Sequence, residues 1–297
     1  MKNLLKLVPL FLLMILFLSA MGCADKTPDR YATRVEDLSN DGILRRSGSE
    51  TPFWPGEYFQ ADVAENDTCQ ALGYSLEGKY NWSIFDKYNS YPTHIYVCEN
   101  GIEFGIRGDN NKPVLLNLMN KEFFDTEPYL EDVENPEEYG RSYAAEIAGS
   151  FIENMDEYKQ MTEEPITSVK EKDGKSYSVT YYLFTYYREI AGYRSSDFIT
   201  VKVTSKGHLA SVFVGDTDAF ENRSFSIDKE ALQQAINEKI AAVYRDTGYH
   251  VNNSTVDEQK IVKAPDGGFY IASSVIVQLD DNGEQVNTLI DLLSFLK

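Results

Sequence analysis

One arrangement of helix and turn signals occurs twice in the second half of this sequence. Apolar residues recur at helical spacing over 144–158 and again over 232–243. Each stripe is followed by a short β-type run, an Asp-Gly turn, a longer run, a glycine turn and a further run. The two Asp-Gly turns are Asp173-Gly174 and Asp266-Gly267. The repetition predicts two copies of one structural unit.

Start signals precede both predicted helices. Asn135 is followed by Pro136 at the first helical position, and Glu138 lies three residues after Asn135. Asp228 opens the second helix. The separation between Asn135 and Asp228 equals the separation between the two Asp-Gly turns. This agreement supports the repeat.

The strand pattern completes the expected unit. Residues 199–204 alternate apolar and polar side chains, which predicts a strand with one buried face and one wet face. We therefore expect an α+β fold of tandem modules, at 135–215 and 216–297. In each module, one helix packs on a three- or four-stranded antiparallel sheet.

A small β-rich region is expected at 51–134, before the modules. Residues 94–98 and 102–106 flank Glu99-Asn100-Gly101, which predicts a hairpin. A third apolar run at 113–119 predicts a further strand. This region has no counterpart of the helix-led repeat.

The order of a helix followed by hairpins, over roughly 135–297, resembles PepSY-like and cystatin-like modules. Modules of this kind are frequent in lipoproteins of Gram-positive bacteria. The resemblance rests on element order and turn positions. It implies binding, inhibition or regulation, and not catalysis.

The first 22 residues are typical of an export signal. Lys2 and Lys6 precede an apolar run at 7–18, which is too short to span a hydrocarbon core of about 30 Å. Residues 19–23 resemble the lipobox of bacterial lipoproteins, and this implies cleavage before Cys23 and a diacylglyceryl thioether on its sulfur. The alternative is an ordinary secretory signal cut near Ala20. The lipobox predicts an extracytoplasmic protein anchored in the cell membrane through acyl chains, each buried methylene contributing about 0.8 kcal/mol.

The segment 23–50 is predicted to be a disordered tether. It is polar, carries many charges and a Ser47-Gly48-Ser49 run, and has too few large apolar residues to close a core. The folded part is expected to begin near Thr51.

The charge of the chain excludes a nucleic-acid partner. The sequence has 47 acidic and 28 basic residues, a formal net charge of −19. Removal of Lys2 and Lys6 with the leader lowers this value to −21. Binding to phosphates needs a basic surface, so we exclude nucleic acid.

Two cysteines remain after the predicted anchor, Cys69 and Cys98. Outside the cytoplasm an even pair predicts a disulfide. Closing a loop of about 30 residues would stabilise the fold by about 3.5 kcal/mol in the chain-entropy description. The alternatives are two buried thiols or a nucleophilic cysteine.

No catalytic, metal or cofactor motif stands out in the sequence. His94, His208 and His250 are widely separated and form no zinc-protease pattern. Residues 226–229 match the Ser-x-x-Lys of penicillin-interacting enzymes, but the companion motifs are missing and the stretch coincides with a helix start. We predict no catalytic residue, no metal and no cofactor.

Carboxylates are numerous, and most are explained without a ligand. Asp216 and Asp218 are candidates for calcium, but aspartate is also common in turns. The acidic run from Glu127 to Glu138 is expected to be a solvated approach to a helix start, where negative charge is mildly favourable.

The most conspicuous stretch is an aromatic block at 181–187. On a strand, alternate rings point to opposite faces, so half of them should project away from the helix. We predict an aromatic binding surface for a peptide, glycan or partner protein. The alternative is that the second face packs on a neighbouring domain. The surface residues are Tyr181, Tyr182, Phe184, Tyr186 and Tyr187.

Two functions from different classes follow. The first is a non-enzymatic envelope protein that binds a protein, peptide or wall component through its sheet faces. The second is an envelope hydrolase with scattered catalytic groups. The hydrolase requires a histidine within hydrogen-bond reach of both a carboxylate and a serine or cysteine. We favour the binding protein.

Overall fold

The computed structural model describes residues 57–85, 90–172, 174–221, 223–245, 247–263, 267–281 and 283–296. All of these residues belong to the compact unit Thr33–Lys297. The predicted leader, the tether and the acylation site at Cys23 lie outside the described residues. Their predictions therefore stay predictions.

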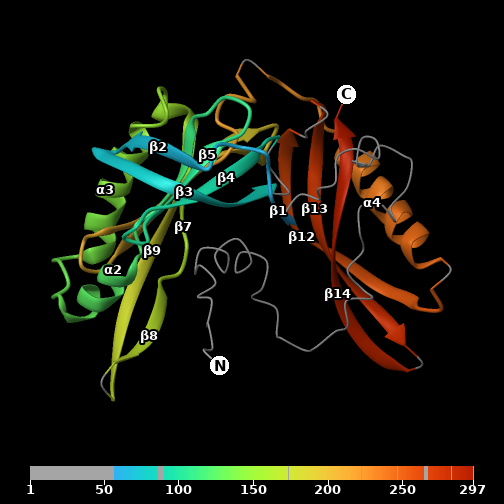
Figure 1. Ribbon diagram of the computed structural model, residues 1–297. Helices are drawn as coiled ribbons and strands as arrows, with labels where there is room; N and C mark the ends of the chain where they lie inside the picture. Colours follow the sequence, from blue (N-terminus) through green and yellow to red (C-terminus); the bar gives the residue numbers. More distant parts are fainter. Residues whose placement is uncertain are drawn as a thin grey trace. The chain divides into compact units, whose positions relative to one another are not determined.

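Fourteen described strands form one mixed sheet, accompanied by three α-helices and two short 3₁₀ helices (Figure 1). The first six strands are β1 (Glu57–Phe59), β2 (Asn66–Ala71), β3 (Tyr74–Phe85), β4 (Pro92–Val97), β5 (Glu103–Arg107) and β6 (Pro113–Asn117). The next five are β7 (Tyr158–Thr162), β8 (Ile166–Lys172), β9 (Lys175–Ile190), β10 (Tyr193–Thr204) and β11 (Leu209–Val214). The last three are β12 (His250–Lys263), β13 (Phe269–Asp281) and β14 (Glu284–Leu296). The helices are α2 (Lys121–Thr126), η3 (Glu127–Tyr129), α3 (Pro136–Gly149), η4 (Met155–Glu157) and α4 (Lys229–Tyr244).

The pairing path of the sheet joins strands that are far apart in the sequence. It runs β1-β3-β4-β5-β6-β11-β10-β12-β13-β14, with β2 beside β3, β9 beside β10, and β7 and β8 beside β9. The β6–β11 pair is antiparallel. Among the described strands, the one parallel pair is β10–β12, which matches Arg194 with Lys260 and Ser195 with Ile261.

The predicted fold class is wrong. We expected an α+β fold of tandem helix-on-sheet modules, whereas the described chain is mostly β and its strands belong to one mixed sheet. Strand β11 pairs with β6 of the N-terminal region, and β10 pairs with β12. The backbone hydrogen bonds of these strands are completed across the expected module boundaries, so the modules do not form separate sheets.

Several individual elements do lie where the sequence predicts them. Strands β4, β5 and β6 lie at the three expected runs of the N-terminal region, and α4 lies at the second expected helix. Helix α3 lies at the first but ends at Gly149, so the predicted continuation of its apolar stripe to residue 158 is wrong. The β9–β10 hairpin turns at Ala191 and Gly192, with φ of 52° and 84°. A two-residue turn with positive φ at both positions matches the twist of a hairpin, and glycine adopts this conformation at low cost.

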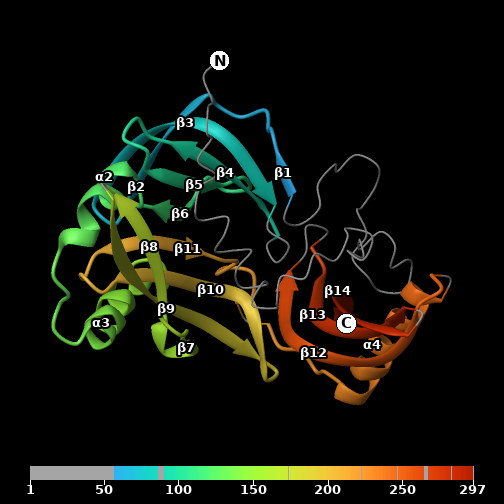
Figure 2. The ribbon, with the colours of Figure 1, turned by 90° about the horizontal axis from the view of Figure 1, so that it is seen from below.

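Helix α3 covers one face of the sheet, over β9 and β10 (Figure 2). Ala144 and Ala148 of the helix lie in the same core as Val201 and Val203 of β10. The predicted start of this helix is correct in position but not in mechanism. Asn135 has a left-handed backbone conformation (φ 47°), and its side chain makes no capping hydrogen bond.

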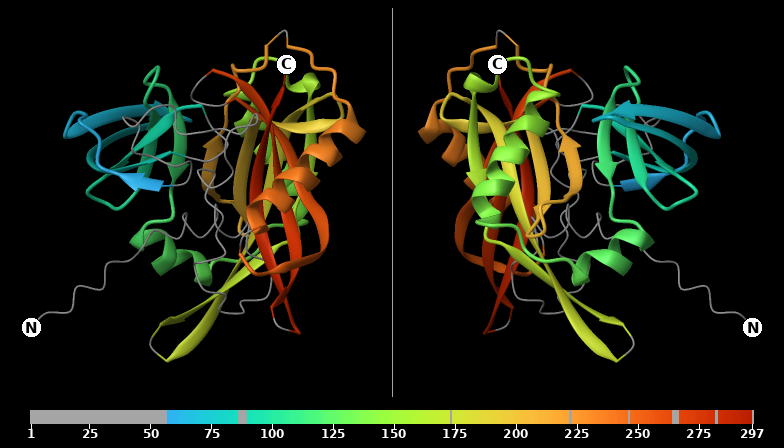
Figure 3. Two further views of the ribbon diagram at one scale, coloured as in Figure 1. Left: turned by 90° about the vertical axis from the view of Figure 1, so that its right-hand side faces the viewer. Right: turned by 90° about the vertical axis from the view of Figure 1, so that its left-hand side faces the viewer.

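Strand β9 is longer than the ladder it shares with β10. Its first residues pair with β8, and together they form a two-stranded ribbon that extends beyond the neighbouring strands (Figure 3). From Tyr181 onward, β9 pairs with β10 on one side. The other side is completed by β7, from Phe184 to Arg188. The aromatic block therefore lies on a strand that is paired on both sides, between β10 and β7.

Helix α4 begins as the sequence predicts. The Asp228 carboxylate accepts hydrogen bonds from the amides of Glu230 and Ala231, at 3.0 and 3.1 Å. These amides have no partner within the helix. Ile236 and Ile240 then pack on the β12–β14 strands in a second core.

Replacing this cap should measurably weaken the fold. We expect Asp228→Ala to lower the free energy of unfolding by about 1 kcal/mol, because two amide donors lose their acceptor. Urea denaturation followed by circular dichroism measures the change. Glu230→Ala, in the same helical turn, serves as the control. Equal stability of Asp228→Ala and the wild type would contradict the capping role.

Candidate functional site

The face of β10 that points away from α3 is polar and buried. Thr200, Lys202 and Thr204 are 7, 5 and 0% exposed. The alternation predicted at 199–204 is therefore confirmed, but the expectation that its polar face is wet is wrong. Burying polar groups lowers the stability of the fold unless they form hydrogen bonds, so the partners of each group on this face matter.

Four polar side chains form a row across this face, in cross-strand register. Glu103 of β5 pairs with Asn117 of β6, and Asn117 pairs with Ser211 of β11. Ser211 in turn pairs with Lys202 of β10. All four residues are at most 9% exposed. Paired residues on adjacent strands point to the same face, so the row is continuous.

The acidic end of the row is satisfied. Asn117 Nδ2 donates a hydrogen bond to Glu103 Oε2 at 2.9 Å. Burial raises the pKa of Glu103, and this hydrogen bond opposes the rise. The local structure therefore accounts for Glu103.

The amine of Lys202 makes a different kind of contact. Its Nζ lies 4.7 Å from the centre of the Tyr181 ring. Among the described residues, none forms a hydrogen bond or ion pair with this nitrogen. Burial lowers the pKa of Lys202 to about 8, whereas the charge of Glu163 acts in the opposite direction. The contact that the described residues give this amine is the Tyr181 ring, and its nitrogen is not among the fully buried atoms that lack a hydrogen-bond partner.

Two oxygen atoms without a hydrogen-bond partner belong to Glu127 and to the hydroxyl group of Tyr181. His208 Nδ1 is 2.6 Å from Glu127 Oε2, but Glu127 Oε1 has no hydrogen-bond partner and the residue is 1% exposed. The Tyr181 hydroxyl is also buried without a partner. Burial raises the pKa of Tyr181, and the negative charge of Glu127 raises it further. These two unpartnered oxygens therefore lie close enough to interact electrostatically.

Exposed apolar side chains surround the His208–Glu127 pair. Tyr129 lies two residues after Glu127 in η3 and is 51% exposed. Its ring contacts the Tyr177 ring at a tilt, with ring centres 4.5 Å apart. Tyr139 of α3, 44% exposed, packs against Gly207, the residue before His208. These residues come from η3, the start of α3, β9 and the β10–β11 turn.

The predicted aromatic binding surface is not formed by the residues we named. Tyr181, Phe184 and Tyr186 are 1, 0 and 5% exposed, while Tyr182 and Tyr187 are half-buried. Phe184 and Tyr186 belong to the core under α3. On the opposite face of β9, Tyr181 is buried as well. The alternative, packing of the second face on a neighbouring domain, stays a prediction.

The expectation that the acidic run is solvated is wrong for its first residue. Glu127 is buried, whereas most of the run from Glu131 to Glu138 is exposed as expected. Nothing local distinguishes Glu127 from its neighbours. The contact with His208, 81 residues later in the chain, depends on the tertiary fold.

The two cysteines are free thiols that lie near each other. Cys69 is buried and Cys98 is half-buried against the same core. Burial raises the pKa of Cys69 to about 11, and negative charge at Cys98 would raise it further. A raised pKa disfavours the thiolate, so neither position suits a nucleophile. The disulfide remains a prediction for an oxidising compartment.

The hydrolase hypothesis needs one histidine beside both a carboxylate and a nucleophile. His94 Nδ1 lies 2.7 Å from Ser83 Oγ, and His208 pairs with Glu127. His250 is exposed at the start of β12. Among the described residues, no histidine forms hydrogen bonds or ion pairs with both a carboxylate and a serine or cysteine. The two halves of a catalytic arrangement therefore occur at different histidines.

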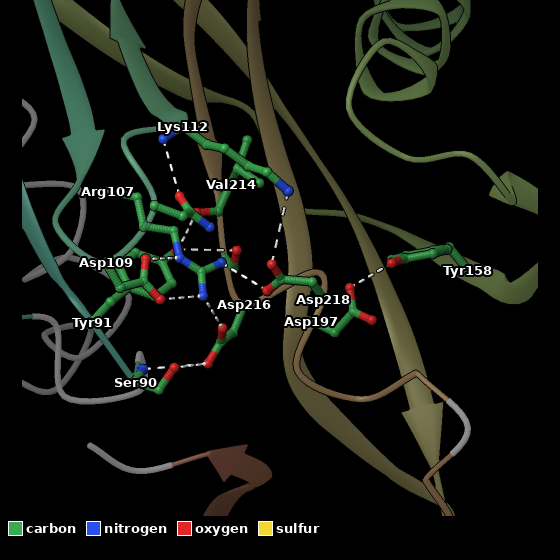
Figure 4. A network of polar contacts seen from close by, with 12 residues as sticks. Ser90, Tyr91, Arg107, Asp109, Lys112, Tyr158, Asp197, Val214, Asp216 and Asp218 are labelled. Atoms are coloured by element: carbon green, nitrogen blue, oxygen red, sulfur yellow. Dashed lines mark hydrogen bonds and ion pairs between the residues drawn. The ribbon is translucent and has the colours of Figure 1, made fainter. Parts of the chain in front are cut away.

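The calcium candidates Asp216 and Asp218 are bound to an arginine (Figure 4). Arg107 Nη2 lies 3.2 Å from Asp216, and Nη1 lies 2.8 Å from Asp218. The same guanidinium pairs with Asp109 and stacks at 3.8 Å over the Tyr91 ring. Arg107 thus supplies the positive charge that a calcium ion would have supplied. No described group of three or more acidic, histidine or cysteine side chains forms a metal site.

A second buried carboxylate belongs to the bulge between β9 and β10. Asp197 is 0% exposed, accepts a hydrogen bond of 2.5 Å from Tyr158 and pairs with Arg188 Nε at 2.7 Å. Burial raises the pKa of Asp197 to about 6, although both partners oppose the rise.

The raised pKa of Asp197 predicts a pH dependence. The unfolded carboxylate titrates near 3.8 and the folded one near 6, so folding takes up a proton in this interval. Asp197 therefore stabilises most below pH 4, and this contribution is lost as pH rises through 6. The advantage of the wild type over Asp197→Asn should shrink by up to about 3 kcal/mol across this window, measured by urea denaturation. Parallel profiles of the wild type and Asp197→Asn would contradict the shift.

Comparisons with known proteins give no relative for this chain. No family model matches the sequence, and searches of curated proteins and of solved structures find no significant match. The resemblance to PepSY-like and cystatin-like modules therefore stays a prediction. Within the described residues, no helix is long and apolar enough to cross a membrane.

Proposed function

We propose that this chain is a lipid-anchored extracytoplasmic protein that binds a protein, peptide or wall component without catalysis. Its anchor is Cys23, and its binding surface is the sheet face that carries Lys202. The anchor rests on the apolar leader and the lipobox-like residues 19–23. The acidic charge of the chain is compatible with a soluble body beside an anionic membrane.

Lys202 is the observation that carries the binding role. It is 5% exposed, and no described residue forms a hydrogen bond or ion pair with its amine. Burial of the side chain lowers the pKa of the amine, so the charged form of Lys202 is disfavoured at this position. A ligand with an acceptor group, such as a carboxylate, would satisfy the amine.

Mass spectrometry of the native protein tests the anchor. We expect an N-terminal Cys23 whose mass includes a diacylglyceryl group, and no residue of the leader. The Cys23→Ala variant should lack the acyl group and leave the membrane fraction. An unacylated N-terminus, or a retained leader, would refute the lipid anchor.

An NMR titration tests the binding face. The mature acylated chain in detergent is titrated with soluble cell-wall fragments and with peptides that carry a free carboxylate. We expect amide shifts around Lys202 and Ser211, and loss of these shifts in Lys202→Met. The matched control is Lys121→Met, at an exposed lysine of α2. Binding that persists unchanged in Lys202→Met would exclude this face.

A further inference from the structure

Strand β14 ends the pairing path of the sheet (Figure 1). It pairs with β13 from Glu284 to Leu296 without a register shift, and no other described strand pairs with its second side. This side is a row of backbone N–H and C=O groups with which another strand can pair. Proteins usually protect such an edge, so an edge without protection indicates a partner.

The described edge strands differ in how they are protected. Strands β1 and β7 have three and five residues, and β8 has three charged residues among its seven. Strand β12 pairs with β10 at two residues only, and its free part contains two register shifts. Short length, charge and bulges all oppose pairing between edges. Residues 285–294 of β14 have no bulge, no proline and a single charged residue, Asp291.

Two observations indicate which residues of β14 direct their backbone groups outward. Asp281 lies opposite Glu284 across a connection of two residues, and the residues that flank such a turn bond to each other. Bonded and non-bonded residues then alternate along the strand, so the odd-numbered residues, Leu289 among them, point away from β13. Leu293 belongs to this odd series, and its carbonyl accepts a hydrogen bond of 2.7 Å from Lys239 of α4. Both observations assign the same series to the edge.

We propose that β14 is a dimer interface, at which a second copy of this chain pairs its own β14 antiparallel across a twofold axis at Leu289. Twofold symmetry sets Leu289 opposite the partner's Leu289, and Asn287 opposite the partner's Asp291. All of these residues are odd-numbered, so their backbone groups face the axis, as hydrogen-bonded pairs require. No like charges meet in this register, and like charges directly opposite would be destabilising.

The side chains beside the edge favour a second copy as the partner. Leu289 pairs with Ile276 of β13, and the two are 38 and 39% exposed. Paired residues point to the same face, so the register joins this apolar pair to the same pair of the second copy. Each pair then covers part of the other's apolar surface. Of the formal net charge of −19, residues 285–294 contribute only the charge of Asp291, so pairing brings little like charge together.

Disulfide cross-linking in cells that make the full chain tests the register. Residues that form a hydrogen-bonded pair have Cα atoms about 5.5 Å apart, which a disulfide can bridge, so Leu289→Cys should give a covalent dimer on mild oxidation. The matched control is Ile276→Cys, which is equally exposed but lies one strand farther from the axis in each copy. Its two Cα atoms would be about 15 Å apart, so it should give about tenfold less dimer. Electrophoresis without reductant measures both yields, and the wild type shows any product of the native thiols.

A charge at the axis tests the association without a cross-link. Leu289→Lys would set two lysines opposite each other and should weaken dimer formation at least about tenfold. This variant should fold, because Leu289 is 38% exposed. The matched control is Val169→Lys, at an apolar residue of β8 that is 66% exposed, and it should dimerise as the wild type does. Light scattering of the mature chain in detergent measures the mass of each protein.

Three results would overturn the proposal. Equal yields of covalent dimer from Leu289→Cys and Ile276→Cys would exclude this register. A wild type that is monomeric, with no cross-link at Leu289→Cys, would leave the edge to an extended segment of a different protein. Dimers of equal strength in Leu289→Lys and the wild type would place the contact elsewhere. Because Lys202 lies on β10, Lys202→Met should dimerise as the wild type does, and none of these results bears on the proposed role of Lys202.

Discussion

Arg107→Met should lower the free energy of unfolding by about 3–5 kcal/mol, the largest loss that we expect from a single substitution. The Arg107 side chain is 6% exposed and pairs with Asp216, which is 0% exposed, and with Asp109 and Asp218. Methionine fills a similar volume but leaves the buried Asp216 carboxylate without its cation. Urea denaturation at neutral pH measures the loss.

Two further variants separate this explanation from a general packing defect. Lys112→Met removes an exposed lysine 3.9 Å from Asp218, and should change the stability by less than about 1 kcal/mol. Adding Asp216→Asn to Arg107→Met removes the unpaired charge and should recover part of the loss. A loss below about 1 kcal/mol in Arg107→Met would contradict the account of this cluster.

Lys202→Met should stabilise the protein at pH 7 by about 1–3 kcal/mol and should remove binding at the sheet face. The pKa of Lys202 is lowered from 10.5 to about 8 by burial. The folded protein therefore gives up this proton at lower pH than the unfolded chain, and the cost of the buried charge is greatest below pH 8. As pH rises from 8 to 10.5, the stability of the wild type should approach that of the variant.

Urea denaturation of the wild type and of Lys202→Met between pH 6 and 11 measures the difference between their stabilities. The control Lys121→Met should follow the wild type at every pH, because Lys121 is exposed. A variant that is less stable than the wild type at pH 7 would show that Lys202 serves the fold. Lys202 would then give no support to a binding role.

The local structure of this chain was largely readable from its sequence, whereas the fold class was not. The cap at Asp228, the Gly192 turn and the runs that form β4, β5 and β6 have signals within a few residues. The β6–β11 and β10–β12 pairs have no such signal, because each joins segments separated by long stretches of chain. These two pairs convert the expected modules into one sheet.

The candidate site was missed for the same reason. In the sequence, Lys202 is one polar residue of an alternating strand, and Glu127 is one acid of a run. Burial distinguishes them, and burial depends on which strands and loops pack around them. One signal was present in the sequence: a lysine lies in the middle of a strand whose neighbours are threonine, valine and isoleucine. This signal does not by itself separate a buried lysine from a solvated one.

The titration of the Lys202 amine tests the central claim most directly. NMR of the mature chain with labelled lysine side chains, assigned by comparison with Lys202→Met, gives the pKa of this group alone. We predict a midpoint near pH 8, which moves upward when a carboxylate-bearing ligand binds. A midpoint near 10.5, unaffected by such ligands, would mean that the amine is solvated and that the sheet face has no binding role.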